Sequence, residues 1–199
     1  MGFKEMGKEE IRPGYDRISD IASAFGGYGR IPQKIMDYAG DRGERCHSIV
    51  YDLMNDIVVK EDRYIFCNKS IRGYIDSWQR FANTFDMSNI MLQENRLYME
   101  TPKVTGQVDL LVRQGNQTIL LDWKTSKDIG KHWAIQASGY CELLKANNIN
   151  VTKILFVKLD KDGGEPVITE YSEDKQLFLH AHDLYVRFFK DLTVNMEFE

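Results

Sequence analysis

The stretch VTGQVDLLVRQGNQTILLDWKT, residues 104–125, predicts a β-hairpin. Two mostly apolar runs flank Gly115-Asn116, a pair of residues that tolerates the positive φ of a tight two-residue turn. Such a turn pairs Gln114 with Gln117, and each further pair keeps the same sum of residue numbers. Asp109 is then expected opposite Asp122, and Gln107 opposite Lys124.

Side chains alternate between the two faces of a strand, so the hairpin is expected to have one apolar and one mixed face. The predicted apolar face carries Val108, Leu110, Val112, Ile119, Leu121 and Trp123. The other face carries Asp109, Asp122 and Lys124, with Leu111 and Leu120 further along. The hairpin is therefore expected to hold two carboxylates side by side, with an amine next to them.

Paired carboxylates on a half-buried sheet destabilise it, because like charges repel and resist ionising together. A divalent cation removes the conflict, since neighbouring carboxylate oxygens suit Mg²⁺. Lys124 could then place an attacking water and stabilise negative charge on a phosphate. The alternative is a solvated surface hairpin on which Asp109, Asp122 and Lys124 form an ion-pair cluster without function.

The rest of the chain predicts helices around this hairpin and further strands. Helices are predicted over about 16–25, 43–59, 71–85 and 131–146, and from a Ser172 cap to about Leu192. Strands are predicted over 94–100, 103–113, 117–124, 153–159 and 166–171. The glycine-rich segment 26–29 is expected to end the first helix. This order predicts a single mixed α/β domain over residues 1–199, of which about 1–12 are expected to be loose.

Composition narrows the class of protein. The 199 residues carry a net charge of -4 and include three cysteines, at 46, 67 and 141. An odd number of scattered cysteines argues against a disulfide framework or a four-cysteine cluster, so each is expected to be a buried thiol. The sequence contains no apolar run long enough to span a bilayer and no secretory signal, so a cytoplasmic protein is expected. Because the net charge of the protein is mildly negative, any contact with nucleic acid would have to use a local patch of basic residues.

Three blocks in order resemble the PD-(D/E)XK nuclease superfamily, and most closely its RecB-like exonuclease branch. They are Gly106-Gln107-Val108-Asp109, then LLDWKT at 120–125, then Gln136-Ala-Ser-Gly-Tyr140. The resemblance covers about residues 43–144. It implies a restriction-endonuclease-like fold, in which helices flank a mixed central sheet.

The resemblance also implies roles for the residues of the hairpin. Asp109 and Asp122 become metal ligands, with the backbone carbonyl of Trp123 as a third, and Lys124 becomes the catalytic lysine. His47, four residues after Gly43, matches a histidine ligand on an early helix of RecB-like members. By itself, His47 is more simply a histidine of a helix surface or a helix cap, because nothing local marks it as a ligand.

Further positions match the family less directly. Gln136 and Tyr140 are spaced to share one helix face, which in the family borders the active site; the alternative is a helix simply packed on the sheet. Glu94 matches a glutamate that some members use near the metal, or is a solvated strand end. Mg²⁺ is the expected cofactor, and Mn²⁺ is expected to substitute for it.

The expected function is a metal-dependent DNA exonuclease in recombination, repair or phage replication. The alternatives are a structure-specific or restriction-like endonuclease, and a non-catalytic DNA-binding member of the fold. Basic residues that could neutralise phosphates are Arg42, Arg45, Lys127, Lys131 and His132, and Tyr28 could stack on a base. The sequence contains no nucleotide-binding motif, so a helicase or recombination partner would be a separate chain.

Overall fold

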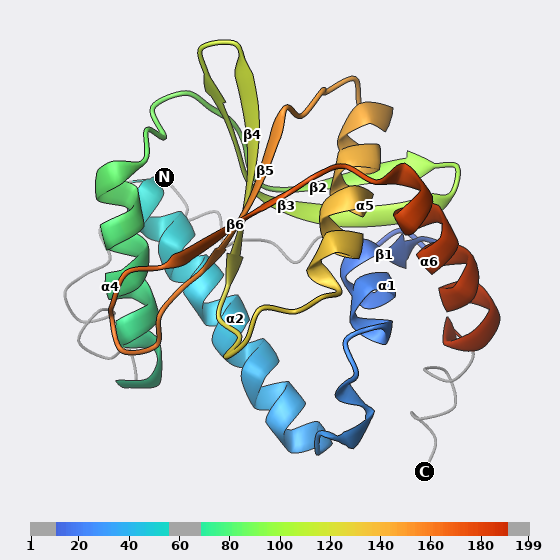
Figure 1. Cartoon of the computed structure of the whole chain (residues 1–199), viewed down its shortest axis with the longest axis horizontal. Coiled ribbons are helices and arrows are strands. Elements are labelled where there is room, and N and C mark those ends of the chain that lie inside the picture. The colour runs from blue at the N-terminus through green and yellow to red at the C-terminus, as the bar shows by residue number, and fades with distance from the viewer. Residues whose placement is uncertain (1–10, 56–68, 191–199) are drawn as a thin grey trace.

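The computed structural model describes residues 11–55 and 69–190, which form a six-stranded mixed sheet covered by helices on both faces (Figure 1). The strands are β1 (Asp16–Arg17), β2 (Ile90–Glu100), β3 (Lys103–Gln114), β4 (Gln117–Lys124), β5 (Lys153–Lys158) and β6 (Val167–Tyr171). The helices are α1 (Ile18–Ala24), α2 (Gln33–Met54), α4 (Lys69–Thr84), α5 (Trp133–Ala146) and α6 (Lys175–Phe188), with a short 3₁₀ turn, η1 (Tyr28–Arg30). The expected α/β class is confirmed.

Strand β3 organises the sheet because three other strands pair with it. Antiparallel β2 follows β3 from Lys103 to Val112 along one edge. The other edge is therefore left for both β1, which pairs in parallel with Val104 and Thr105, and β4, which pairs from Gln114 back to Leu110. Residues 106–109 lie between these two ladders, at a fork where β4 leaves β3 and continues beside β5.

Two apolar clusters hold the layers together. Helices α2 and α4 cover one face of the sheet, and α1, α5 and α6 cover the other (Figure 1). Trp78 and Phe81 of α4 pack edge-on against Trp123 of β4 on the first face. Phe178 of α6 is fully buried on the second face, beside α5 and α1. Burial on both faces explains the apolar runs at residues 119–121 of β4 and 154–157 of β5.

The predicted hairpin register is confirmed for the residues of β3 and β4 that pair with each other. Gly115 takes φ 55°, as the turn requires, and the ladder runs from Gln114–Gln117 to Leu110–Leu121. The predicted pairs Asp109–Asp122 and Gln107–Lys124 are wrong, because the ladder ends at the fork before reaching them. Val108 was also assigned to the wrong face: it packs with Leu111 and the α5 side rather than with Leu110, since strict alternation fails where the strands part.

Other element boundaries differ from the prediction. Helix α2 begins at Gln33 rather than near Gly43, and β2 begins at Ile90 rather than at Glu94. Asp16 and Arg17 form β1 instead of opening a helix. Asp174, not Ser172, caps α6 by accepting a hydrogen bond from the Leu177 N–H. The last helix ends at Phe188 rather than at Leu192. The expected loose segment up to residue 10, the end of the second predicted helix, Cys67 and Leu192 itself lie outside the described residues.

Cys46 and Cys141 are buried thiols, as expected. Burial is the main cause that raises the pKa of Cys141 to about 12, so this thiol stays protonated. In the parts of the chain that the structure describes, no helix combines the length and apolar character that crossing a bilayer requires.

Glycine at position 73 allows α4 to approach the β5–β6 turn. A Cβ on Gly73 would lie 1.9 Å from the Lys161 carbonyl oxygen, whereas a Cβ on Gly40 of α2 would meet nothing within 4 Å. We expect Gly73→Ala to lower the free energy of unfolding by about 1–3 kcal/mol, because backbone must move. Gly40→Ala, the matched control, should raise it by up to about 1 kcal/mol through helix propensity. Urea unfolding measures both, and equal effects would contradict the close approach.

Candidate active site

The fork between β3 and β4 opens into a cleft of about 910 Å³. Helix α2, strands β2, β3 and β4, and helix α5 each contribute side chains to its lining. The eight residues singled out from the sequence all line this cleft: His47, Glu94, Asp109, Asp122, Trp123, Lys124, Gln136 and Tyr140. Segments nearly a hundred residues apart in the chain therefore meet at one point.

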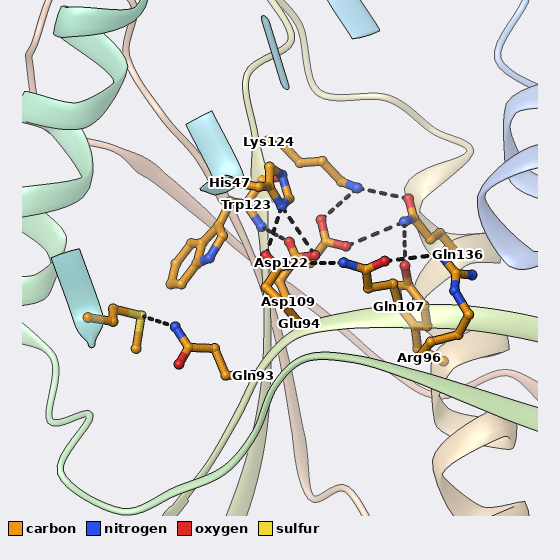
Figure 2. Close-up of polar contacts among 12 residues, drawn as sticks. His47, Gln93, Glu94, Arg96, Gln107, Asp109, Asp122, Trp123, Lys124 and Gln136 are labelled. Atoms are coloured by element: carbon orange, nitrogen blue, oxygen red, sulfur yellow. Dashed lines mark hydrogen bonds and ion pairs between the residues drawn. The ribbon is translucent and has the colours of Figure 1, made fainter. Parts of the chain in front are cut away.

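His47, Glu94 and Asp109 form a group that could hold a metal ion (Figure 2). His47 Nδ1 lies 3.4 Å from Glu94 Oε1 and 3.4 Å from Asp109 Oδ1, and one ligand atom from each residue lies within 4.8 Å of the others. The backbone of Glu94 has φ 51°, an uncommon conformation for a residue with a side chain. Backbone strain of this kind clusters at functional sites.

The carboxylates of Glu94 and Asp109 favour a positive charge on His47, whose Nδ1 lies near both of them. Burial alone would lower the pKa of His47, but the carboxylates of Asp109 and Glu94 outweigh burial and raise the pKa well above 6.5. Nε2 contacts the Trp123 carbonyl oxygen at 3.2 Å, so Nε2 carries a hydrogen and Nδ1 faces the carboxylates. The carboxylates of Glu94 and Asp109 therefore favour a proton on His47 Nδ1.

Asp109 links the site to the backbone of the fork. Its Oδ2 accepts a hydrogen bond of 2.8 Å from the Trp123 N–H, while its Oδ1 faces His47. The side chain thus replaces the ladder bond that ends when β4 leaves β3. Asp109 is 7% exposed, so the orientation of this carboxylate is fixed by the fold.

Asp122 and Lys124 form a second, adjoining group with Gln136. Lys124 Nζ lies 2.6 Å from Asp122 Oδ2 and donates a hydrogen bond of 2.9 Å to Gln136 Oε1. Gln136 Nε2 faces Asp122 Oδ1 at 3.4 Å and the Tyr140 hydroxyl at 3.3 Å. Lys124 Nζ also lies 4.8 Å from the centre of the Phe156 ring, so the amine is held in a partly desolvated position.

The oxygen atoms of the cleft fit a divalent cation, and the surroundings of the Asp122 carboxylate support this. Its Oδ2 is buried and, despite the short approach of Lys124, has no donor with hydrogen-bond geometry among the described residues. Burial is the largest cause that raises the pKa of Asp122 to about 6, with Asp109 adding to the shift and Lys124 opposing it. A buried carboxylate with a raised pKa gains from a divalent cation nearby, because the cation would stabilise its ionised form.

Tyr140 and Gly106 fix how closely α5 approaches β3. Burial raises the pKa of Tyr140 well above 10, so its hydroxyl is neutral. A Cβ on Gly106 would lie 2.6 Å from Tyr140 Cε1, so a glycine at this position allows the Tyr140 ring to lie against the strand. Both readings given for Tyr140, core residue and border of the site, therefore hold together.

The predicted phosphate-contacting residues do not line this cleft, as far as the described residues go. Arg42 donates to the Thr125 carbonyl oxygen at 3.0 Å and lies over the Tyr74 ring. The Tyr28 hydroxyl bonds to His132 Nε2 at 3.0 Å, which ties η1 to the start of α5. Five polar residues of the cleft are absent from the site residues proposed from the sequence, because no local pattern marks them: Arg17, Ser19, Glu44, Arg96 and Gln107.

Comparison with known proteins agrees with this geometry. The family model of the PD-(D/E)XK nuclease superfamily matches residues 37–197. The chain belongs to that superfamily. Among curated proteins, no relative matches the sequence.

Two solved structures resemble this member of the superfamily. A candidate exonuclease of Eubacterium rectale has a TM-score of 0.52 and 18% identity, covering 93% of this chain and 83% of its own. The crystal structure of SSO0001 has a TM-score of 0.48 and 14% identity, covering 89% and 77%. The first supports the restriction-endonuclease-like fold; the RecB-like branch stays a prediction.

The raised pKa of Asp122 predicts how stability depends on pH without metal. Its folded-state pKa is about 6 against an ordinary 3.8, so the folded protein holds a proton that the unfolded chain releases. Stability from this group is therefore lost as pH rises from about 4 to about 6. We expect the free energy of unfolding of Asp122→Asn, minus that of the wild type, to grow over this window by on the order of a few kcal/mol.

Urea unfolding in EDTA between pH 4 and pH 7 measures this difference, with exposed Asp183→Asn as the matched control. The control should follow the wild type at each pH. A constant difference between Asp122→Asn and the wild type across the window would contradict the raised pKa.

Proposed function

We propose that this protein is a metal-dependent deoxyribonuclease, most closely a RecB-like exonuclease acting in recombination, repair or phage replication. The observation that carries the proposal is the fork, where His47, Glu94 and Asp109 meet beside Asp122 and Lys124. Carboxylates that face a histidine and a partly buried lysine are a costly arrangement, and binding of a cation and a phosphodiester would relieve the cost. Membership of a nuclease superfamily gives the same reaction class.

Mg²⁺ would be held by carboxylate oxygens of Asp109, Asp122 and Glu94, with His47 and the Trp123 carbonyl also available, and Mn²⁺ would substitute. When bound, the cation polarises the phosphodiester and lowers the pKa of its water. The side chains that surround it are already oriented by hydrogen bonds from the backbone and from neighbouring residues. Such preorganisation favours catalysis, because little reorganisation is needed at the moment of reaction.

Lys124 would act as the catalytic lysine. Asp122 and Gln136 hold its amine from two sides, and the Phe156 ring lies beneath it. A fixed ammonium group at this position can orient a water molecule and stabilise negative charge that develops on the phosphate. Gln136 and Tyr140 would support this arrangement, because Gln136 contacts Lys124, Asp122 and the Tyr140 hydroxyl.

The same proposal includes DNA as the substrate and a single nuclease domain over residues 1–199. A helicase or recombination partner on a separate chain would supply unwinding or loading. A structure-specific or restriction-like endonuclease would use the same residues, so only the substrate separates the two activities. A non-catalytic DNA-binding member would have no use for the Asp109–His47–Asp122–Lys124 arrangement.

Degradation of end-labelled linear DNA and closed circular DNA, single- and double-stranded, with Mg²⁺, Mn²⁺ or EDTA, tests the proposal. We expect metal-dependent loss of linear DNA only. Asp122→Asn should reduce the rate below detection, and Lys124→Ala should reduce it by about 10²–10³-fold, since each removes stabilisation of the developing charge. Cutting of closed circles would indicate the endonuclease, and DNA binding without cleavage would indicate the non-catalytic protein.

The chain offers a matched control for Lys124. Lys158 is the register partner of Lys124 on β5, but its amine donates to the Lys127 carbonyl oxygen. We therefore expect Lys158→Ala to keep a cleavage rate close to that of the wild type. An equal loss of rate in both variants would show that general positive charge, rather than the held Lys124 amine, drives cleavage.

A further inference from the structure

A chain of hydrogen bonds leads away from Glu94 to two residues that no motif marks (Figure 2). Gln107 Nε2 donates to Glu94 Oε2 at 2.7 Å, and Arg96 Nη2 donates to Gln107 Oε1 at 3.0 Å. Glu94 Oε1 faces His47. Both oxygens of the Glu94 carboxylate are therefore engaged, one toward the candidate metal group and one toward Gln107.

The sheet register explains this chain of contacts. Arg96 of β2 lies directly opposite Gln107 of β3, and Glu94 lies two residues before Arg96. Opposite and diagonal cross-strand neighbours are close enough for long side chains to interact. Because the φ of Glu94 is 51°, its backbone departs from the regular strand, so the direction of its side chain depends on contacts such as that with Gln107.

Arg96 determines which way the Gln107 amide points. An arginine can only donate hydrogen bonds, so it requires the carbonyl oxygen of the amide. The amide nitrogen is then left to donate to Glu94. Without Arg96, the amide could rotate and present its oxygen to the carboxylate, which would repel it. The Nε of Arg96 is shielded from solvent, which favours action through Gln107 over direct contact with DNA.

We propose that Gln107 and Arg96 are positioning residues for metal binding: Gln107 aims the Glu94 carboxylate at the metal, and Arg96 orients Gln107. The inference rests on the proposed function, because it assumes that Glu94 is a ligand. Residues that orient metal ligands contribute about 10–100-fold to metal affinity. Since Arg96 acts through Gln107, its effect should disappear once Gln107 is replaced.

Calorimetric titration of the metal-free protein with Mn²⁺, without DNA, tests this on Gln107→Met, Arg96→Met and the double variant. We expect Gln107→Met to weaken Mn²⁺ binding by about 10–100-fold. Arg96→Met should weaken it by a similar or smaller factor, and the double variant should match Gln107→Met alone. Arg96→Lys, which keeps a donor, should recover part of the affinity. Arg17→Met is the matched control, since Arg17 lines the cleft but pairs with Asp20.

Each other outcome overturns the inference. Unchanged Mn²⁺ affinity in Gln107→Met, with thermal unfolding like that of the wild type, would show that Glu94 needs no such support. Additive losses would show that Arg96 acts independently of Gln107, and a raised KM for DNA with unchanged Mn²⁺ affinity would make Arg96 a substrate contact. If the wild type binds Mn²⁺ and cleaves DNA, these results contradict only the inference. If the wild type does neither, the proposed function fails together with it.

Discussion

The hydrogen bond from the Trp123 N–H to the Asp109 carboxylate is the interaction on which both the sheet and the site depend. Where β4 leaves β3, a buried backbone donor would lose its ladder partner, and leaving it unpaired would cost about 1–3 kcal/mol. The Asp109 side chain takes the place of that partner. Its second oxygen faces His47, so the same carboxylate closes the fork and borders the candidate metal group. The separation of the strands and the geometry of the site therefore depend on the same side chain.

The charges gathered at the fork carry a cost that the apolar clusters on both faces of the sheet offset. Asp109 and Asp122 are both buried, and the strained backbone of Glu94 lies next to them. Buried charges and strain oppose folding, and they persist only where the surrounding structure is strong enough to hold them. Helices on both faces of the sheet bury two large apolar clusters, and these offset the cost. A cation at the fork would add stability by binding only the folded chain.

Sequence patterns predicted what is local and failed where distant segments interact. Alternation and turn chemistry predicted β3, β4 and the register up to Leu110–Leu121. They could not predict the fork, because it arises where β4 leaves β3 while the other edge of β4 stays paired with β5, a strand that begins only at Lys153. The start of α2 was missed because its first turns are mostly exposed and lack an apolar period. Gln107 was expected to face Lys124, but the fork separates them and β2 brings it to Glu94.

The two lysines of β4 and β5 show why a motif alone does not define a catalytic group. Lys124 and Lys158 are register partners in parallel strands, so they share one face of the sheet and carry the same charge. Only the Lys124 amine lies beside Asp122, Gln136 and Phe156, where buried partners hold it in place. The Lys158 amine instead satisfies the Lys127 carbonyl oxygen. What would let a lysine stabilise a phosphate is the set of groups that desolvate and orient it, and for Lys124 these are Asp122 of β4, Gln136 of α5 and Phe156 of β5.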